Sequence, residues 1–469
     1  MKILVLNCGS SSLKFQLIDV VQEEVAAKGL VEKIGGSSAI LSYQPQHKNP
    51  LREVVEIKNH EAALKFVLNY LTDKTVGVLR EIAEIQAFGH RVVHGGEQFS
   101  GSVLITPDVV NGIRACVIFA PLHNPANLMG IQACAEAAPG IPQVAVFDTA
   151  FHGNLPKHAF LYGLPYPMYE KLRIRRYGFH GTSHWYVSQK AAELLRRPYR
   201  DFKVITCHLG NGSSIAAVRN GGSVDTTMGF TPLEGLMMGT RCGDLDPAIV
   251  SYLMQKKQLS AEGVDALMNK ASGLKGICRT TNDMRELDEA AQAGSKLHQL
   301  ALEMFCYRIK KYIGAYFAVL DGAEAVVFTA GIGENSATVR RKSCAGLEAL
   351  GIVIDDERNR NRETVISNGP TPVLIVPTNE ELAIAQETYR VLQEDQRQRL
   401  AAQETVRIRT VLQTLTDADK AQIAIVWSQH QQLPLAELAA VIRANMSLEL
   451  DAPALATLLQ RIGFGNQAA

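Results

Sequence analysis

Two arginines and a histidine are the residues of this 469-residue chain best suited to binding anions. Arg91 lies in GHRVVHGG and Arg241 in GTRCGD, so glycines surround both positions in the sequence. A guanidinium binds carboxylate or phosphate through paired hydrogen bonds that lysine cannot reproduce. His180, in RRYGFHGTSH, is a candidate donor to a charged transition state. Either arginine alone has a simpler interpretation as a solvated surface residue, but the set predicts a site for anionic substrates.

Two similar turns supply small residues that suit a phosphate. NCGSSS follows the first apolar segment and precedes Lys14, and HLGNGSS, residues 208–214, follows a second apolar segment in mid-chain. Small residues allow close approach of the backbone, and consecutive N–H groups form an anion-binding nest. Ordinary hairpin turns use the same residues. The repetition, together with Lys14, favours phosphate binding.

A third glycine-rich segment runs from Gly331 to Asn335 directly after an apolar run. It resembles the start of a dinucleotide-binding fingerprint, but Ser336 stands where the sixth position requires Gly or Ala. The pattern therefore favours a turn that packs against a nucleotide base or α-phosphate. The sequence contains no G-x-x-x-x-G-K-[ST] phosphate loop.

Acidic side chains follow two predicted strands. Asp148 comes directly after an apolar run and has a helix N-cap as its simplest role, while Glu380 suits the first turn of a helix. A single carboxylate would also suffice for the magnesium ion of a nucleotide. His180 and His184 are four residues apart, but Gly181 argues against a helix that would present both to zinc.

Composition excludes several classes of protein. The chain is 46% hydrophobic and 20% charged with a net charge of +1, which is typical of a globular protein and gives no basic field for nucleic acid or a membrane surface. The 8 cysteines occur singly, as expected of reduced thiols. No signal-peptide core and no membrane-length apolar run is present, so we expect a cytoplasmic protein.

The predicted elements alternate between strands and helices. Alternation in residues 13–17 predicts a strand that buries Leu13, Phe15 and Leu17 and leaves Lys14 on the other face. A similar hairpin recurs at residues 204–218, which suggests a duplicated α/β domain with a ligand cleft between the copies. Further strands are predicted at 85–93, 143–147, 325–329 and 373–376, and a helix at 297–319.

A change in composition marks the C-terminal part. No glycine occurs between Gly369 and Gly463, and Gln, Ala and Leu dominate from about Glu394. Helix starts are predicted at Thr416-Asp417 and at Asp451, with a stop at Gly463. We expect domains at 1–150 and 151–393, with 375–393 packing back on the first, and an all-helical extension of unknown role at 394–469.

The order of the motifs resembles the acetate kinase family. The matching segments are NCGSSSLKFQL, GHRVVHGG, VFDTAFH, RRYGFHGTSH, HLGNGSS, DTTMGFTPLEGLMMGTRCGDLDP, GIGEN and PTNEEL, which cover Met1 to about Arg390. The resemblance implies the α/β fold shared by acetate and sugar kinases, actin and the heat-shock ATPases. In that fold two duplicated domains enclose an ATP cleft, and the family is usually homodimeric.

Residues that match the family's motifs imply the site, and none of them departs from the family's pattern. The implied catalytic residues are Asp148, His180, Arg241 and Arg91; the substrate-binding residues are Arg91, Val93, Leu122 and Pro232; the ATP-binding residues are Lys14, His208, Leu209, Gly210, Asn211, Gly212, Asp283, Met284, Arg285, Gly331, Ile332, Gly333, Glu334 and Asn335; and Asn7 and Glu380 bind Mg²⁺ or Mn²⁺.

The resemblance implies reversible transfer of the γ-phosphoryl group from ATP to acetate. Acetate is ionised at neutral pH and needs no general base, so we expect Asp148 to orient a donor or a metal-bound water, although the family assigns it proton transfer. Propionate or butyrate kinase is the alternative within the family. An ATP-binding interaction protein that acts through the helical extension is the alternative from another class, and a dehydrogenase is a third. No nucleic acid or membrane partner is expected.

Overall fold

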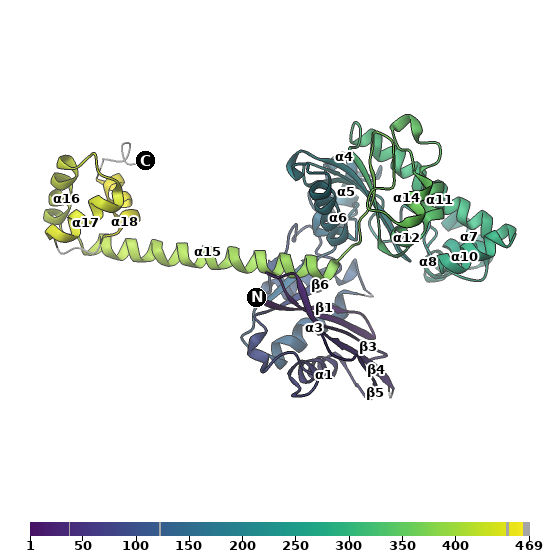
Figure 1. Cartoon of the computed structure of the whole chain (residues 1–469), viewed down its shortest axis with the longest axis horizontal. Coiled ribbons are helices and arrows are strands. Elements are labelled where there is room, and N and C mark those ends of the chain that lie inside the picture. Colours follow the sequence, from purple (N-terminus) through teal and green to yellow (C-terminus); the bar gives the residue numbers. More distant parts are fainter. Residues whose placement is uncertain (37, 122, 447–449, 463–469) are drawn as a thin grey trace. The chain divides into compact units, whose positions relative to one another are not determined.

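The computed structural model describes residues 1–36, 38–121, 123–446 and 450–462 (Figure 1). The chain divides into two compact units, Met1–Val391 and Leu392–Ala469. Within the described residues, no helix is both long and apolar enough to cross a membrane. All eight cysteines are free thiols, and all but Cys242 are buried, as the sequence predicts.

An eight-stranded mixed sheet forms the first part of the larger unit, in the order β5-β4-β3-β2-β1-β6-β8-β7. Strands β1 to β5 are antiparallel neighbours, whereas β6 runs parallel to β1 and β8 runs parallel to β6. Helices α1 and α3 pack against each other and contact this sheet. The strands are β1 (Lys2–Cys8), β2 (Ser12–Asp19), β3 (Glu24–Glu32), β4 (Ala39–Pro45), β5 (Leu51–Val55), β6 (Ala87–Val92), β7 (Val103–Leu104) and β8 (Gln143–Phe147), and the helices are α1 (His60–Thr72), α2 (Pro107–Ala115) and α3 (Asn124–Ala137).

The β1–β2 hairpin confirms the pattern in the sequence. The two strands pair from Lys2 with Asp19 to Cys8 with Leu13. Leu13, Phe15 and Leu17 are buried while Lys14 is exposed, because alternate residues of a strand point to opposite faces.

A five-stranded sheet, in the order β11-β10-β9-β12-β13, forms the second part of this unit. Its β9–β10 hairpin is antiparallel, as the second Gly/Ser turn predicts, and β12 lies parallel to both β9 and β13. The strands are β9 (Lys203–Leu209), β10 (Ser213–Arg219), β11 (Gly222–Thr226), β12 (Ala325–Thr329) and β13 (Val373–Ile375).

Helices surround the second sheet, and α11, predicted at 297–319, is the longest of them in this unit's second part (Figure 1). Leu302, Phe305, Ile309 and Ile313 of α11 join the core of the sheet. The helices are α4 (Lys157–Phe160), α5 (Tyr166–Leu172), α6 (Gly181–Leu194), α7 (Ala248–Lys257), α8 (Ala261–Lys270), α9 (Gly273–Cys278), α10 (Met284–Gln292), α11 (Lys296–Val319), α12 (Ala330–Asn335), α13 (Ala337–Cys344) and α14 (Asp356–Asn361). Two mixed sheets with helices confirm the predicted α/β class.

The smaller unit is helical. Helix α15 (Glu380–Thr414) begins in the larger unit and continues past the boundary at Leu392, and α16 (Asp417–Gln429), α17 (Leu435–Met446) and α18 (Ala452–Arg461) follow. Thr416 caps α16 in a capping box and Asp451 caps α18, so both predicted helix starts are confirmed. The predicted stop at Gly463 lies outside the described residues. Trp427 and Leu438 belong to a separate hydrophobic core of this unit.

Candidate active site

Arg91 and Asp148 meet where two neighbouring parallel strands end. Arg91 is on β6, and Asp148 directly follows β8 and donates its backbone N–H to Val92 O at 3.0 Å. The Arg91 guanidinium donates from Nε to both carboxylate oxygens at 3.1 Å and from Nη2 to Oδ2 at 2.5 Å. The Asp148 charge raises the pKa of Arg91, so the guanidinium keeps its charge. Asp148 is therefore a partner of Arg91 and not the helix N-cap of its simplest interpretation.

Two asparagines of α3 hold the loop that follows Arg91. Val93 donates its N–H to Asn127 Oδ1 at 3.1 Å, and Asn127 Nδ2 donates to Cys8 O at 3.0 Å. His94 N–H donates to Asn124 Oδ1 at 3.1 Å. Asn127 thereby joins the ends of β1 and β6, and both asparagines are buried. No local sequence signal points to them, because Asn124 beside Pro125 is typical of a turn.

His180 is fixed by an unusual backbone and a close glycine. His180 has φ 56° and caps α6, whose first residue, Gly181, donates its N–H to Asp148 O at 2.9 Å. A Cβ on Gly181 would lie 2.3 Å from that oxygen, so only glycine allows this approach. The expectation that Gly181 prevents a helix here is wrong: the helix begins at this residue and contains His184.

The His180 ring is neutral and lies against a second histidine. Burial lowers its pKa well below the usual value, and neighbouring rings and arginines lower it further. The ring stacks on His208 with centroids 4.1 Å apart. His208 is itself neutral, since burial lowers its pKa to about 3.

Arg241 and His180 flank the same small space above Gly212. An ideal Cβ on Gly212 would lie 3.4 Å from Arg241 Nη1 and 3.5 Å from His180 Nε2. Arg241 donates to Pro232 O at 3.3 Å, and no carboxylate among the described residues forms an ion pair with it. Its guanidinium is therefore available to an anion at this point.

His123, for which the sequence predicts no role, is influenced by the charges of this site. Arg91 and Arg241 both lower its pKa, after burial as the main cause, while Asp148 raises it. Its position just before α3 carried no local signal for a site.

An apolar cluster includes one of the predicted substrate residues. Val93, Ala120, Phe179, Met228 and Met238 pack together and are buried. Pro232 reaches the site through its carbonyl bond with Arg241. Leu122 lies outside the described residues.

Carboxylates from the start of α15 adjoin the Arg91–Asp148 pair. Burial raises the pKa of Glu380, with added repulsion from Asp148 and Glu381 and an opposing effect of Arg91. Lys14 forms an ion pair with Glu381 and stands opposite Asn7 in the β1–β2 ladder. Thus Asn7, Lys14 and Glu380 lie in one region.

The chemistry of this donor set fits a magnesium ion shared with phosphates. A carboxylate and an amide oxygen are hard ligands that leave positions for water and phosphate. Within the described residues no group of three or more His, Cys, Asp or Glu could hold a metal.

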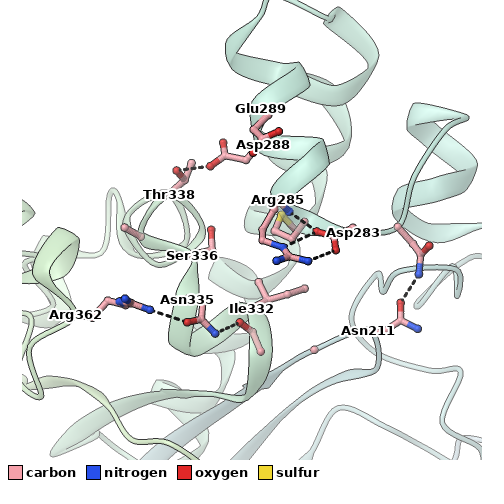
Figure 2. Close-up of a pocket in the computed structure, with 15 residues that line it drawn as sticks. Asn211, Asp283, Arg285, Asp288, Glu289, Ile332, Asn335, Ser336, Thr338 and Arg362 are labelled. Atoms are coloured by element: carbon pink, nitrogen blue, oxygen red, sulfur yellow. Dashed lines mark hydrogen bonds and ion pairs between the residues drawn. The ribbon is translucent and has the colours of Figure 1, made fainter. Parts of the chain in front are cut away.

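A cavity of about 1060 Å³ opens beside the second sheet (Figure 2). Eight predicted ATP residues line it: Gly210, Asn211, Asp283, Met284, Arg285, Gly331, Ile332 and Asn335. Six others are not part of this lining: Lys14, His208, Leu209, Gly212, Gly333 and Glu334. Seven further residues line the cavity without having been predicted from the sequence: Asn282, Asp288, Glu289, Ser336, Ala337, Thr338 and Arg362. The volume suits a nucleotide.

Hydrogen bonds join the segments around this cavity, as Figure 2 shows for several of them. Asn282 donates to Asn211 Oδ1 at 2.9 Å, Thr338 donates to Asp288 at 2.9 Å, and Arg362 donates to Asn335 at 2.9 Å. The segment 331–335, predicted as a turn, forms helix α12 directly after β12. The cavity wall is thus built from residues distant in sequence.

Arg340 stabilises the same wall of the cavity through hydrogen bonds to α12. It is fully buried and donates to Gly333 O at 2.8 Å, to Glu334 O at 2.9 Å and to Asn359 Oδ1 at 2.7 Å. Burial lowers its pKa to about 10. The guanidinium fixes the end of α12 against α14 through carbonyl oxygens.

A two-sheet α/β fold with a nucleotide-sized cavity and grouped anion-binding side chains is typical of kinases that phosphorylate small molecules. The chain belongs to the acetokinase family, whose model matches residues 2–386. An acetate kinase of Alkaliphilus metalliredigens (strain QYMF) is 56% identical over 396 residues, which are 84% of this chain and 100% of the relative. Both findings confirm the predicted family.

Solved structures agree with this assignment. The crystal structure of Porphyromonas gingivalis acetate kinase superposes with a TM-score of 0.81 at 46% identity, covering 83% of this chain and 99% of that one. A propionate kinase from Francisella tularensis subsp. tularensis SCHU S4 superposes with a TM-score of 0.78 at 43% identity, covering 82% and 98%. The predicted fold class is confirmed.

Proposed function

We propose that this protein is an acetate kinase, which transfers the γ-phosphoryl group of ATP reversibly to acetate and gives acetyl phosphate and ADP. The observation that carries the proposal is the grouping of Arg241 and His180 within 3.5 Å of one point above Gly212, whose neighbours Gly210 and Asn211 line the nucleotide cavity. A phosphoryl group that is transferred from ATP at this point lies within reach of both Arg241 and His180.

Arg91 is suited to bind the acetate carboxylate. Its guanidinium is oriented by Asp148 and keeps its charge. A carboxylate oxygen of acetate attacks the γ-phosphorus, the bond from that phosphorus to the β–γ bridging oxygen breaks, and ADP departs. Acetate is already ionised, so no proton has to be removed. This supports an orienting role for Asp148.

Arg241 and neutral His180 suit the equatorial oxygens of the transferring group. Donors that are fixed before the reaction stabilise developing charge without reorganising. Asn7 and Glu380 would hold Mg²⁺, or Mn²⁺, which supplies neutralisation of phosphate charge when bound. The protein's own part is to place these donors around one phosphorus atom.

The apolar cluster suits the methyl group of acetate and admits a second candidate substrate. Val93, Phe179 and Met228 are among its buried members. One added methylene changes binding by only about 1–3 kcal/mol in an apolar pocket. One structural relative is a propionate kinase, so we expect propionate to react as well. Because its added methylene must also fit the pocket, we expect it to react more slowly than acetate.

Acetyl phosphate formation tests the activity directly. With MgATP, trapping acyl phosphate as hydroxamate should give kcat/KM highest for acetate, about 10- to 200-fold lower for propionate, and lower again for butyrate. Higher kcat/KM for propionate would replace the substrate assignment. ATP binding without product from any of the three acids would contradict the kinase proposal and favour an interaction protein.

The resemblance also leads us to propose a cytoplasmic homodimer. Its domains would be 1–150, on which residues 375–393 pack back, then 151–393, and a helical extension at 394–469. Helix α7 supports a second copy, because it has no buried residue and exposes Ile249 and Tyr252 on one face. An exposed apolar face of this kind is typical of an interface between proteins.

A further inference from the structure

A line of buried hydrogen bonds leads from the second sheet to His180. His180 Nδ1 lies 2.9 Å from Ser214 Oγ, the same oxygen lies 2.7 Å from His184 Nε2, and His184 Nδ1 lies 2.7 Å from Thr206 Oγ1. Thr206, His184 and Ser214 have no solvent-exposed surface. These three side chains are therefore shielded from bulk solvent, and they form their hydrogen bonds with other protein groups.

Only two proton orders make all three contacts and also donate the buried protons of both hydroxyls. Burial lowers the pKa of His180 and of His184 well below the usual value, so each ring is neutral and carries one proton. A neutral imidazole donates from one nitrogen and accepts at the other, and a hydroxyl has one proton to donate. Once one end of the line is fixed, every proton along it is fixed.

The Thr206 end decides between the two orders. The Thr206 hydroxyl has two acceptors within reach, His184 Nδ1 at 2.7 Å and Ala216 O at 3.5 Å. In the opposite order His184 Nδ1 would donate to Thr206, and the buried Thr206 proton would be left with Ala216 O, which is too far away for a strong hydrogen bond. Thr206 therefore donates to His184 Nδ1.

The remaining protons follow from this donor. His184 carries its proton on Nε2 and donates it to Ser214 Oγ, so the single Ser214 proton is donated to His180 Nδ1. His180 is left with its proton on Nε2. That nitrogen is the atom 3.5 Å from the point above Gly212 that Arg241 also approaches.

We infer that Thr206, His184 and Ser214 are positioning residues that hold His180 as the Nε2–H tautomer. The inference rests on the proposed function, in which this N–H is donated to the transferring phosphoryl group. The opposite tautomer would present a lone pair to phosphate oxygens and repel them. Stacking on His208 fixes the plane of the ring, and the line of hydrogen bonds fixes its proton.

Nitrogen NMR of the ligand-free, full-length protein tests the tautomer directly. In protein labelled with ¹⁵N-histidine, two-bond ¹H–¹⁵N correlations should show His180 and His184 with protonated Nε2 and bare Nδ1 at neutral pH. Thr206→Val removes the decisive proton and keeps the side-chain shape. In this variant we expect His180 to lose its single tautomer, and kcat to fall about 3- to 10-fold with unchanged KM, less than the roughly 100-fold loss expected without the donor itself.

Two further variants separate positioning from stability. Thr206→Ser keeps the hydroxyl and should recover the single tautomer and most of kcat. Thr371→Val removes another buried hydroxyl, which donates to Leu350 O at 2.9 Å in a different region, and should leave the His180 tautomer unchanged. Equal losses in Thr371→Val and Thr206→Val would overturn the inference.

The NMR result does not depend on the reaction. A His180 protonated on Nδ1 in the wild-type protein, or a tautomer unaffected by Thr206→Val, would overturn the inference while leaving acetate phosphorylation intact. Failure to phosphorylate any acid would overturn the proposed function while the Nε2–H tautomer could still be observed.

Discussion

At the scale of single residues, the structure ties Asp148 to Arg91 more directly than to any other group. Three donor–acceptor contacts join the two side chains, and Asp148 is almost fully buried. Breaking a hydrogen bond to a charged group costs about 1.5–3 kcal/mol. The function of Arg91 should therefore depend on this carboxylate even if Asp148 never exchanges a proton.

Asp148→Asn tests the orienting role. The amide cannot accept all the Arg91 donors, so we expect kcat/KM for acetate to fall about 10- to 100-fold, which corresponds to the loss of one or two charged hydrogen bonds. The pH profile should keep its shape. Steady-state kinetics from pH 6 to 9 would measure this, and a shifted profile with unchanged metal dependence would contradict the orienting role. Glu61→Gln, which removes an exposed ion pair with Lys65, is the charge-matched control.

At the scale of elements, the start of α6 positions two residues of the site, Asp148 and His180. Gly181 is the first residue of the helix, and it donates its backbone N–H to the Asp148 carbonyl. It follows His180, whose backbone has the left-handed conformation. Any side chain here would push α6 away from β8. The helix start therefore determines the separation of Asp148 and His180.

Gly181→Ala should lower stability and activity together. The new Cβ would lie 2.3 Å from Asp148 O, so we expect a loss of about 1–3 kcal/mol from overpacking and at least a tenfold drop in kcat/KM. Gly314→Ala is the matched control, because open space surrounds that position within α11 and alanine should stabilise the helix by about 0.5–1 kcal/mol. Urea unfolding and steady-state kinetics would measure both, and an unaffected Gly181→Ala would contradict the close approach.

At the scale of the whole molecule, the chain carries a helical unit beyond the family's length. The family model ends at residue 386, and the relative from Alkaliphilus aligns over its full length with 84% of this chain. The larger unit ends at Val391, and the first turns of α15 contribute Leu382, Ile384 and Val391 to its buried residues. The smaller unit has its own core around Trp427.

A chain ending at Gln396 should remain an active kinase. This truncation keeps the buried residues of α15 up to Val391, so we expect kcat and both KM values within about twofold of the full chain, since the proposed site lies in residues 7–380. Calorimetry should show one unfolding transition fewer than in the full chain. Loss of activity by the folded truncated protein would assign the helical unit a part in catalysis.

The sequence by itself determined the local secondary structure of this protein. Alternation in Leu13 to Leu17 predicted β2, capping residues Thr416 and Asp451 predicted two helix starts, and apolar runs predicted β8 and β12. These features depend on neighbours along the chain, where side-chain periodicity and backbone preferences act. The motifs also predicted the family.

Only the tertiary structure decided which groups meet. It paired Arg91 with Asp148, placed Lys14 on Glu381 away from the lining of the nucleotide cavity, and added Asp288 and Thr338 to that lining. It also brought His180 Nδ1 within hydrogen-bonding distance of Ser214 Oγ, the contact on which the inferred tautomer depends. Such contacts join residues far apart in the chain and depend on packing between elements, so local sequence patterns do not predict them.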